Sequence, residues 1–382
     1  MKRLLIKNFG PIQEATIMLG QVNVITGLQS SGKSCVLKTA CYCSWVEKRL
    51  ELSQKVNGFG EGSAFIDIMA DYYKMASYIQ ETTYIEYETH YLKFSYDHSI
   101  KQFSLSWKNR WEYTKPKVSY IPAERNLVAA IPVWRSLSLD GNMIEFMSDW
   151  DKARKFIKRE ENFLDLGLSY TYDNATNTDN IRLENGKPLM LKESSSGVQS
   201  LLPMYVHLDY LVRGQYDDRK SDISYDRKEE LKNLRSVIYN KFISKDSIDK
   251  NVVTIDGYDY SFSEPEDAEN FKALYDKFIN VNHSEIFLEE PENNLFPTTQ
   301  CKFINWLLDS IKEHNDMLFI ATHSPYVLNQ LIKASPEGLN VFFTYPYNEK
   351  DKTYGVRHLS NEEVQEMYDN GVDVFFNFEL YL

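Results

Sequence analysis

Cysteine is scarce in this sequence of 382 residues, and its placement argues against a metal or disulfide framework. The four cysteines show no C-x-x-C pair and no histidines at the intervals typical of zinc sites; they are Cys35, Cys41, Cys43 and Cys301. Such spacing is typical of reduced thiols in packed helices. We therefore expect neither a structural zinc site nor a set of disulfides.

Long apolar runs are also missing. The sequence contains no run of about 18 apolar residues, the length needed to cross a bilayer. The opening MKRLLIKNFGPIQ has neither the apolar segment nor the cleavage site of a signal peptide. With 43% hydrophobic residues, the chain can nevertheless bury a sizeable core. These features predict a globular, cytoplasmic protein that has no membrane association.

Positive charge is in deficit. The chain has 43 Lys and Arg against 55 Asp and Glu, which gives a formal net charge of −12. Proteins that hold duplex DNA draw much of their affinity from Lys and Arg contacts with phosphates. The composition therefore weakens the hypothesis of a surface built to hold DNA, although a local basic patch remains compatible with it.

A phosphate-binding motif is present where the apolar run VNVIT ends. The stretch GLQSSGKS matches G-x-x-x-x-G-K-[ST] at every position and leads into a segment with helical spacing. In this motif backbone N–H groups surround the phosphates, the lysine reaches the β- and γ-phosphates, and the last hydroxyl contacts Mg²⁺. We expect ATP to contact Gly27, Ser30, Ser31, Gly32, Lys33, Ser34 and Cys35.

Two further apolar strands are expected to end in chemically active side chains. EIFLEEPENN delivers Glu289 and Glu290, and LFIATHSP delivers Thr322 and His323. Because ligands bind at the carboxyl ends of parallel strands, these groups belong near the phosphate loop. We assign Glu289 together with Ser34 to Mg²⁺, Glu290 to the attacking water, and His323 to the γ-phosphate or the water. Glu290, His323 and Lys33 are the expected catalytic residues.

The stretch ESSSGVQSLL, residues 193–202, gathers serines and a glycine at a second expected helix start. It is either a serine-capped helix or a second anion site. If two subunits enclose ATP between them, this helix start in one subunit can cap the γ-phosphate bound by Lys33 of the other.

These motifs, in this order, resemble the ABC-type ATPase heads of the SMC, RecF and overcoming-lysogenization-defect (OLD) groups. The opening IKNFGPIQEATIML and the stretch YIPAER are similar to those heads as well. The resemblance implies that Ser196, Gly197 and Gln199 hold signature positions and contact ATP. It further implies that Glu289 and Glu290 form the Walker B pair, that His323 is the switch histidine, and that a D-loop follows Pro291. Two residues depart from the usual pattern of these heads: Val198 replaces the second glycine of the signature, and Phe296 stands where the relatives often carry a histidine before proline.

The expected fold class is α/β: an ABC-type P-loop ATPase head with an N-terminal antiparallel β-subdomain, a parallel-sheet core and a helical insertion. Four regions are expected along the chain. These are an N-terminal ATPase lobe with the P-loop and a β-meander (1–140), a helical subdomain ending in the signature-like helix (141–212), a charged helical insertion (213–282), and a C-terminal ATPase lobe (283–382).

The leading functional hypothesis is a homodimeric or higher even-numbered ATP-hydrolysing switch that uses ATP and Mg²⁺. By resemblance, it would control a separate effector or nuclease in bacterial defence. A RecF-like or SMC-like DNA-binding repair ATPase is the alternative. Its candidate surface is a basic cluster at Lys152, Arg154, Lys155, Lys158 and Arg159, which can equally be a solvated face. Two further hypotheses are less favoured: a fused Toprim nuclease, for which the short chain after His323 leaves little room, and a purely structural nucleotide-binding protein.

Overall fold

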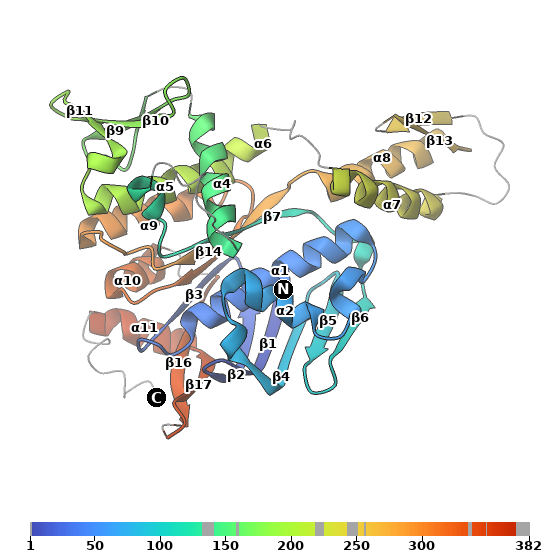
Figure 1. Ribbon diagram of the computed structural model, residues 1–382, viewed down its shortest axis with the longest axis horizontal. Helices are drawn as coiled ribbons and strands as arrows, with labels where there is room; N and C mark the ends of the chain where they lie inside the picture. Colours follow the sequence, from blue (N-terminus) through green and yellow to red (C-terminus); the bar gives the residue numbers. More distant parts are fainter. Residues whose placement is uncertain are drawn as a thin grey trace.

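One large sheet runs through the molecule and joins both ends of the sequence (Figure 1). The computed structural model describes residues 2–131, 141–157, 160–217, 225–242, 251–255, 257–334, 338–348 and 350–371. Within these residues the sheet has 11 strands in the order β6-β5-β4-β1-β2-β17-β16-β3-β15-β14-β7. Strands from the first third and the last third of the chain therefore alternate within one sheet.

The first half of the sheet is an antiparallel subdomain, as the alternating sequence pattern predicts. It contains the β-meander expected in the N-terminal lobe, which the structure places at residues 79–107. Its strands are β1 (Lys2–Phe9), β2 (Ile12–Leu19), β4 (Ile79–Glu88), β5 (Leu92–Asp97) and β6 (Gln102–Trp107). Strand β17 (Thr353–His358) pairs with β2 in parallel and with β16 in antiparallel orientation, and so links this half to the rest of the sheet.

The second half is the parallel core. Its strands are β16 (Leu339–Asn348), β3 (Val22–Gly27), β15 (Met317–Ala321), β14 (His283–Glu289) and β7 (Pro116–Ile121). The three central strands, β3, β15 and β14, are buried on both faces, which explains why they read as largely apolar runs rather than as alternating patterns. Neighbouring residues of β14 separate into two cores: Ile286 and Leu288 pack on one face, and Phe287 packs on the other.

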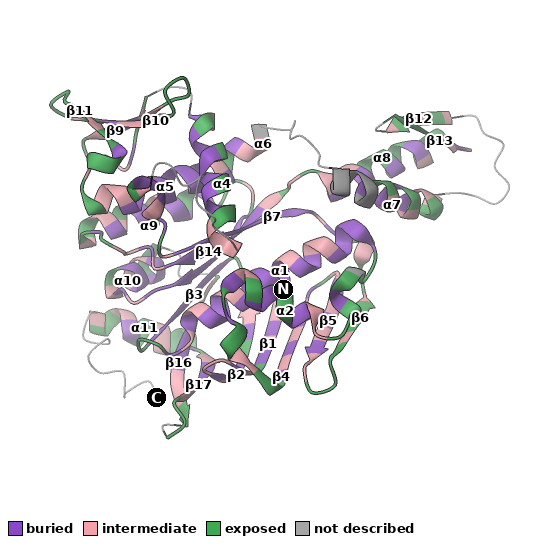
Figure 2. Ribbon diagram, viewed as in Figure 1, coloured by how far each residue is buried: buried purple, intermediate pink, exposed green. Residues whose placement is uncertain are grey.

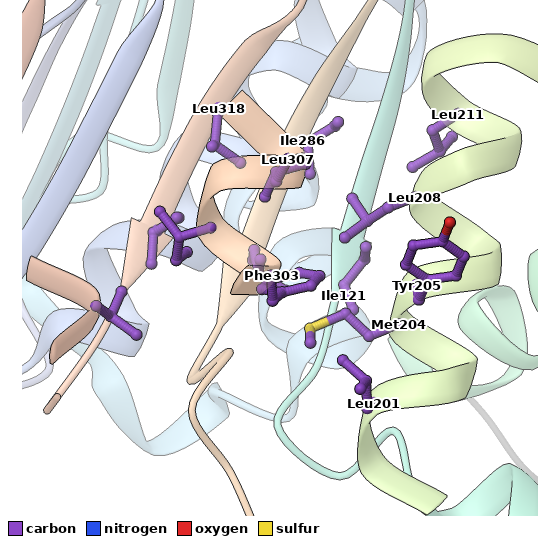
Figure 3. Close-up of a cluster of buried hydrophobic side chains, with 14 of the residues drawn as sticks. Ile121, Leu201, Met204, Tyr205, Leu208, Leu211, Ile286, Phe303, Leu307 and Leu318 are labelled. Carbon is purple, nitrogen blue, oxygen red and sulfur yellow. The ribbon is translucent and has the colours of Figure 1, made fainter. Parts of the chain in front are cut away.

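Helices cover both faces of the parallel core. One face is covered by α1 (Lys33–Ser53), with α2 (Ala64–Tyr73) beside it. The other face is covered by α4 (Gly141–Phe156), α5 (Ser196–Asp209), α9 (Pro297–Ser310) and α10 (Pro325–Ala334). Figure 3 shows Leu201, Met204 and Leu208 of α5 directed toward Ile121 of β7, so the helix is fixed to the edge of the sheet.

Shorter elements complete the core regions. They are α3 (Leu127–Ala130), α6 (Gln215–Asp217), α11 (Asn361–Asn370), a π-helical turn (Tyr210–Gly214), and 3₁₀ turns at Asn57–Gly60, Ala76–Tyr78, Arg110–Glu112 and Leu191–Glu193. In the part of the chain that is described, no helix combines the length and the apolar character needed to cross a bilayer.

The region predicted as a helical subdomain, 141–212, is only partly helical. Between α4 and α5 it forms a four-stranded antiparallel sheet of β8 (Glu161–Asn162), β9 (Leu168–Asp173), β10 (Thr178–Leu183) and β11 (Pro188–Met190). The prediction was wrong here because these strands are short and carry few apolar residues. They are held by contacts distant in sequence, such as Trp150 of α4 near Tyr170 of β9, with ring centroids 6.5 Å apart.

The insertion at 213–282 projects from the body as an arm (Figure 1). It consists of α7 (Tyr225–Phe242), a hairpin of β12 (Asn251–Ile255) and β13 (Tyr258–Phe262), and α8 (Pro265–Ile279). The insertion was predicted as helical, and the hairpin is an element that this prediction did not contain. Gly257 supplies a φ of +80° between the two strands, a conformation that glycine adopts without strain.

The arm has a hydrophobic core of its own. Figure 2 shows buried residues in purple on both α7 and α8. This core includes Leu234, Phe271 and Phe278, and it is continued into the body by Leu52 of α1 and Tyr113. At its base Asn233 Nδ2 donates a 2.5 Å hydrogen bond to the carbonyl of Ser53, the last residue of α1. The arm is therefore attached to the far end of the helix that begins at the P-loop.

Candidate nucleotide-binding site

Three neighbouring parallel strands bring the predicted site loops to one edge of the sheet. Strand β15 lies between β3 and β14, and the register pairs Ala321 with Ile25 on one side and with Glu289 on the other. The P-loop, the Thr322–His323 segment and the Glu289–Glu290 pair therefore start level with one another. The ends of parallel strands are where ligands bind in open α/β sheets.

The P-loop backbone adopts conformations that depend on its glycines. The φ angles are +140° at Gly27, +60° at Ser30 and +90° at Gly32. A Cβ on Gly27 would lie 2.0 Å from Thr344 Oγ1, and a Cβ on Gly32 would lie 2.5 Å from Ile12 Cδ1. Both glycines of the motif are thus required by close approach of neighbouring strands as well as by their backbone angles.

The start of α1 suits an anion. Gly32 is its N-cap and makes no side-chain capping bond, and its first turn contains no acidic residue. An uncapped helix start presents backbone N–H groups and the positive end of the helix dipole. These properties fit the phosphates of a nucleotide.

Lys33 lies folded along the P-loop. Its Nζ donates to the carbonyls of Leu28 at 2.5 Å and Gly27 at 3.1 Å, and its side chain is 4% exposed. Burial lowers the pKa of Lys33 to about 8, against the opposing effect of Glu290 and Glu292. The carboxylates that influence it show that the Glu290 segment is within electrostatic reach of the P-loop.

The remaining P-loop residues divide between the loop and the core. Ser31 is fully buried, donates to the carbonyl of Leu28 at 2.6 Å and shares a 2.5 Å hydrogen bond with Thr344 of β16. Ser34 occupies the second position of α1. Cys35, predicted among the nucleotide contacts, directs its side chain into the core, where burial raises its pKa to about 12 and Sγ lies 3.8 Å from the carbonyl oxygen of Phe9. Only its backbone can face a phosphate.

Glu289 and Glu290 differ in surroundings. Glu289 ends β14, is buried, and accepts a hydrogen bond from the hydroxyl of Tyr120 on the adjacent strand β7. Glu290 follows in a left-handed conformation with φ +43°, which is unfavourable for a residue with a side chain. Its Oε2 accepts a 2.9 Å hydrogen bond from Asn293 Nδ2, and its Oε1 lies 3.6 Å from His323 Nε2.

His323 lies beside the carboxylate of Glu290. Burial lowers its pKa below the ordinary value, Lys33 lowers it further, and Glu290 and Glu289 oppose the shift. The imidazole is therefore neutral near pH 7 and can both donate and accept a hydrogen bond. This suits contact with a phosphate oxygen or a water molecule.

Sequence reasoning missed Glu292 as a site residue. Its carboxylate accepts a 2.9 Å hydrogen bond from Thr322 Oγ1 and a 2.6 Å hydrogen bond from the backbone N–H of His323. The segment after β14 is thereby attached to the segment after β15, which fixes the backbone of His323. The acidic stretch EEPENN offered a signal, but the pairing depends on β14 and β15 being neighbours.

The signature-like residues lie at the start of α5. Ser195 caps the helix by accepting from Val198 N at 3.4 Å, and Gln199 Nε2 donates to the carbonyls of Lys192 and Ser194 at 3.1 and 3.0 Å. Ser196 is exposed, and a Cβ on Gly197 would lie 3.0 Å from the carbonyl oxygen of Asn294. Among the hydrogen bonds of the described residues, none joins Ser196, Gly197 or Gln199 to the P-loop of the same chain.

Comparisons with known proteins add likenesses among solved structures. No family model and no curated protein matches the chain. The SMC head domain from Thermotoga maritima is 12% identical, with 94% of this chain and 98% of that one covered and a TM-score of 0.44. A structure of the recombination mediator RecF is 12% identical, with 94% and 97% covered and a TM-score of 0.31. An ATP-binding cassette of an ABC transporter in its ADP conformation is 10% identical, with 99% of each chain covered and a TM-score of 0.35.

These likenesses carry no conclusion about activity or partners. The fold class follows from the topology of the chain itself. An antiparallel β-subdomain adjoins a parallel core, and the P-loop joins β3 to α1. The acidic pair lies at the end of β14, and the histidine follows β15, the strand between β14 and β3. The expected α/β fold class, with an N-terminal antiparallel β-subdomain and a parallel-sheet core that carries the P-loop, is confirmed.

Proposed function

We propose that the protein binds ATP with Mg²⁺ and hydrolyses it. The observation that carries this proposal is the meeting of Lys33, Glu290 and His323 at the edge formed by β3, β15 and β14, next to an uncapped helix start. Phosphoryl transfer depends mainly on positioning and on stabilising charge, and these groups can do both.

Each residue has a distinct role in this proposal. Lys33 and the backbone N–H groups of the P-loop bind the phosphates, and the carboxylate of Glu290 accepts a proton from the attacking water. The neutral His323 donates a hydrogen bond to a γ-phosphate oxygen. Ser34 and Glu289 would hold Mg²⁺, which when bound supplies positive charge at the phosphate oxygens.

We further propose that two copies of the chain enclose the nucleotide. The start of α5 presents exposed Ser196 and an adjacent glycine, and no described hydrogen bond connects it to the P-loop of its own chain. An isologous dimer would place this helix start against the nucleotide of the other copy. Hydrolysis would then require dimerisation, which makes the protein a switch.

The output of the switch is proposed to be control of a separate effector, such as a nuclease of a bacterial defence system. This step rests on the resemblance to OLD-type heads, and the projecting arm offers a place for such a partner. The alternative, a RecF-like or SMC-like DNA-binding ATPase, has less support, because the described members of the predicted basic cluster form ion pairs with aspartates. Arg154 and Lys155 pair with Asp151, and Lys152 pairs with Asp149. Lys158 and Arg159 lie outside the described residues.

The test is steady-state ATP hydrolysis with Mg²⁺ over a series of protein concentrations, with molar mass measured with and without ATP. Glu290→Gln should abolish hydrolysis and accumulate an ATP-bound dimer. Glu313→Gln, which changes an exposed carboxylate beyond α9, should behave as the wild type. Hydrolysis that persists in Glu290→Gln, together with no ATP-dependent association of the wild type, would contradict the proposal.

A further inference from the structure

A buried arginine connects two parts of the candidate site. Arg125 follows β7 in the stretch YIPAER, and its side chain is 0% exposed. Its guanidinium donates to backbone carbonyl oxygens: Nη1 to Glu289 at 2.9 Å and Pro122 at 3.2 Å, Nη2 to Glu290 at 2.7 Å, and Nε to Ser200 at 3.3 Å.

This use of an arginine is costly and therefore calls for a reason. Buried arginines usually pair directly with a carboxylate, because an unpaired charge is expensive to remove from water. Among the described residues, the hydrogen bonds of this guanidinium all go to backbone carbonyls. Burial lowers the pKa of Arg125 to about 10, opposed by the nearby carboxylates of Glu292, Glu290, Glu289 and Glu124, so it stays charged near pH 7. A planar fork of five N–H groups can join several carbonyls at fixed angles, which an ammonium group cannot do.

The first part that Arg125 holds is the turn at Glu290. The left-handed φ of +43° at this residue persists only if the surroundings impose it. Arg125 bonds the carbonyls of Glu289 and Glu290, while the N–H of Glu290 donates to the carbonyl of Ala321 at 2.8 Å. The turn that orients the Glu290 carboxylate is thus held from the β7 side and from the β15 side.

The second part is the first turns of α5. Arg125 Nε reaches the carbonyl of Ser200, and Asn294 Nδ2 donates a 2.9 Å hydrogen bond to Ser200 Oγ. Gly197 packs so closely on the carbonyl of Asn294 that an added Cβ would lie 3.0 Å from it. The start of α5 and the segment from Glu289 to Asn294 therefore form one connected unit, with Arg125 at its centre.

We propose that Arg125 is a positioning residue that couples the start of α5 to the Glu289–Glu290 turn. The coupling rests on the proposed dimer, in which the start of α5 meets the nucleotide of the other copy. A displacement of α5 at that nucleotide would move the carbonyl of Ser200 and, through Arg125, the turn that aims Glu290 in its own site. Each copy would then register the nucleotide state of the other through this arginine.

The variants are Arg125→Met and Arg125→Lys, with Arg154→Met as the matched control. Arg154 is also buried, but its hydrogen bonds go to Asp151, Asn177 and Asp179, away from the site. Arg125→Met should lower kcat by about 100-fold, the scale expected when a catalytic group is misplaced by a small distance. Its affinity for the slowly hydrolysed analogue ATP-γ-S should stay within about three-fold of the wild type, because the P-loop is unchanged. The kcat of Arg125→Lys should lie between the values of the wild type and of Arg125→Met.

Amide hydrogen exchange provides a readout that does not depend on hydrolysis. In Arg125→Met, peptides covering 196–202 and 289–295 should both exchange faster, while the peptide covering α1 should not change. Arg154→Met should leave both segments as in the wild type. If Arg125→Met does not fold, Arg125→Lys carries the same comparison, since it keeps the charge and most of the volume.

The outcomes separate the coupling from the proposed function. The coupling would be overturned if Arg125→Met folds and keeps the wild-type kcat, or if only one of the two segments exchanges faster. The ATPase proposal would still stand in that case, provided that Glu290→Gln has lost hydrolysis. If the wild type does not hydrolyse ATP, the proposed function fails. The exchange of the two segments then still decides whether Arg125 joins them.

Discussion

Lys33 is surrounded by backbone carbonyls, and its lowered pKa of about 8 leads to a prediction about protons. The unfolded value is near 10.5, so in the nucleotide-free fold the charged form is disfavoured and the lysine loses its proton as pH rises through about 8. Phosphate oxygens favour the charged form and raise the pKa again. ATP binding should therefore take up protons between about pH 8 and 10, and affinity should fall as pH rises through this window.

Calorimetry in buffers of different ionisation enthalpy measures this uptake directly. Lys33→Arg should bind more weakly and without the uptake, because a guanidinium stays protonated throughout the window. Uptake of the same size in Lys33→Arg would assign the proton to another group.

The left-handed backbone of Glu290 predicts a conflict between stability and activity. Glycine adopts this conformation freely, whereas in a residue with a side chain the strain costs roughly 1–2 kcal/mol of folding free energy. Glycine offsets part of this gain, because its unfolded chain is more flexible and loses more entropy on folding. Glu290→Gly should raise the free energy of unfolding by up to about 1 kcal/mol while abolishing hydrolysis.

Lys352→Gly is the matched control for Glu290→Gly. Lys352 has a φ of +50° in an exposed turn far along the chain, so its replacement should stabilise the fold and leave hydrolysis intact. Denaturant unfolding of both variants measures the effect, and a destabilised Glu290→Gly would show that contacts of the carboxylate outweigh the backbone strain.

Individual residues differ in how far the sequence predicts their place. Lys33, Glu290 and His323 were predicted to meet, because each lies in a segment that follows an apolar run and parallel strands end at one edge. Arg125 and Thr344 were not predicted as site residues. Their contacts depend on β7 lying next to β14 and β16 lying next to β3, and strand order is a tertiary property that spacing along the chain does not contain.

Among the elements, those with strong periodicity were predicted well. The meander β4-β5-β6 and the buried strands β3, β14 and β15 lie where the pattern places them. The sheet β8–β11 was missed because one side of each strand faces water and the other contributes few apolar residues, such as Tyr170 and Ile181. Its stability comes from packing against α4, including the 2.8 Å ion pair between Arg154 and Asp179.

The separate core of the arm predicts that this element can lose structure without the body. Phe271 is fully buried and contacts the rings of Tyr239, Tyr260 and Phe262. Phe271→Ala should reduce the stability of the arm by about 3–5 kcal/mol through lost burial and a cavity. Hydrogen exchange should accelerate in 231–242 and 257–278, with the P-loop segment protected as before.

Phe319→Ala provides the comparison for the arm variant. Phe319 lies in β15, in the core beneath α1, so its truncation should accelerate exchange in the P-loop segment and in the strands beside it. Uniform acceleration over the whole chain in Phe271→Ala would show instead that arm and body unfold together.

At the scale of the whole molecule, exposed apolar side chains follow the same strands as the site residues. Phe296 at the start of α9 is 73% exposed, Tyr326 at the start of α10 is 42% exposed, and Leu28 in the P-loop is 40% exposed. Large apolar groups exposed together on one side of a protein are typical of surfaces that become covered by a partner. In the proposed dimer this is the side that the second copy covers.

Phe296→Asp should therefore weaken the ATP-dependent dimer while leaving nucleotide binding by the single chain intact. Aromatic anchors commonly contribute 2 kcal/mol or more to an interface, so the dissociation constant of the Glu290→Gln dimer with ATP should rise by about 30-fold. Val252→Asp introduces the same charge at a side chain that is 61% exposed on the arm, and it should leave the dimer unchanged. Sedimentation over a concentration series measures both constants.

Equal weakening by the two variants would mean that added negative charge, on a chain that already carries −12, opposes association without regard to position. A loss confined to Phe296→Asp would place the interface at the sheet edge where Lys33, Glu290 and His323 meet.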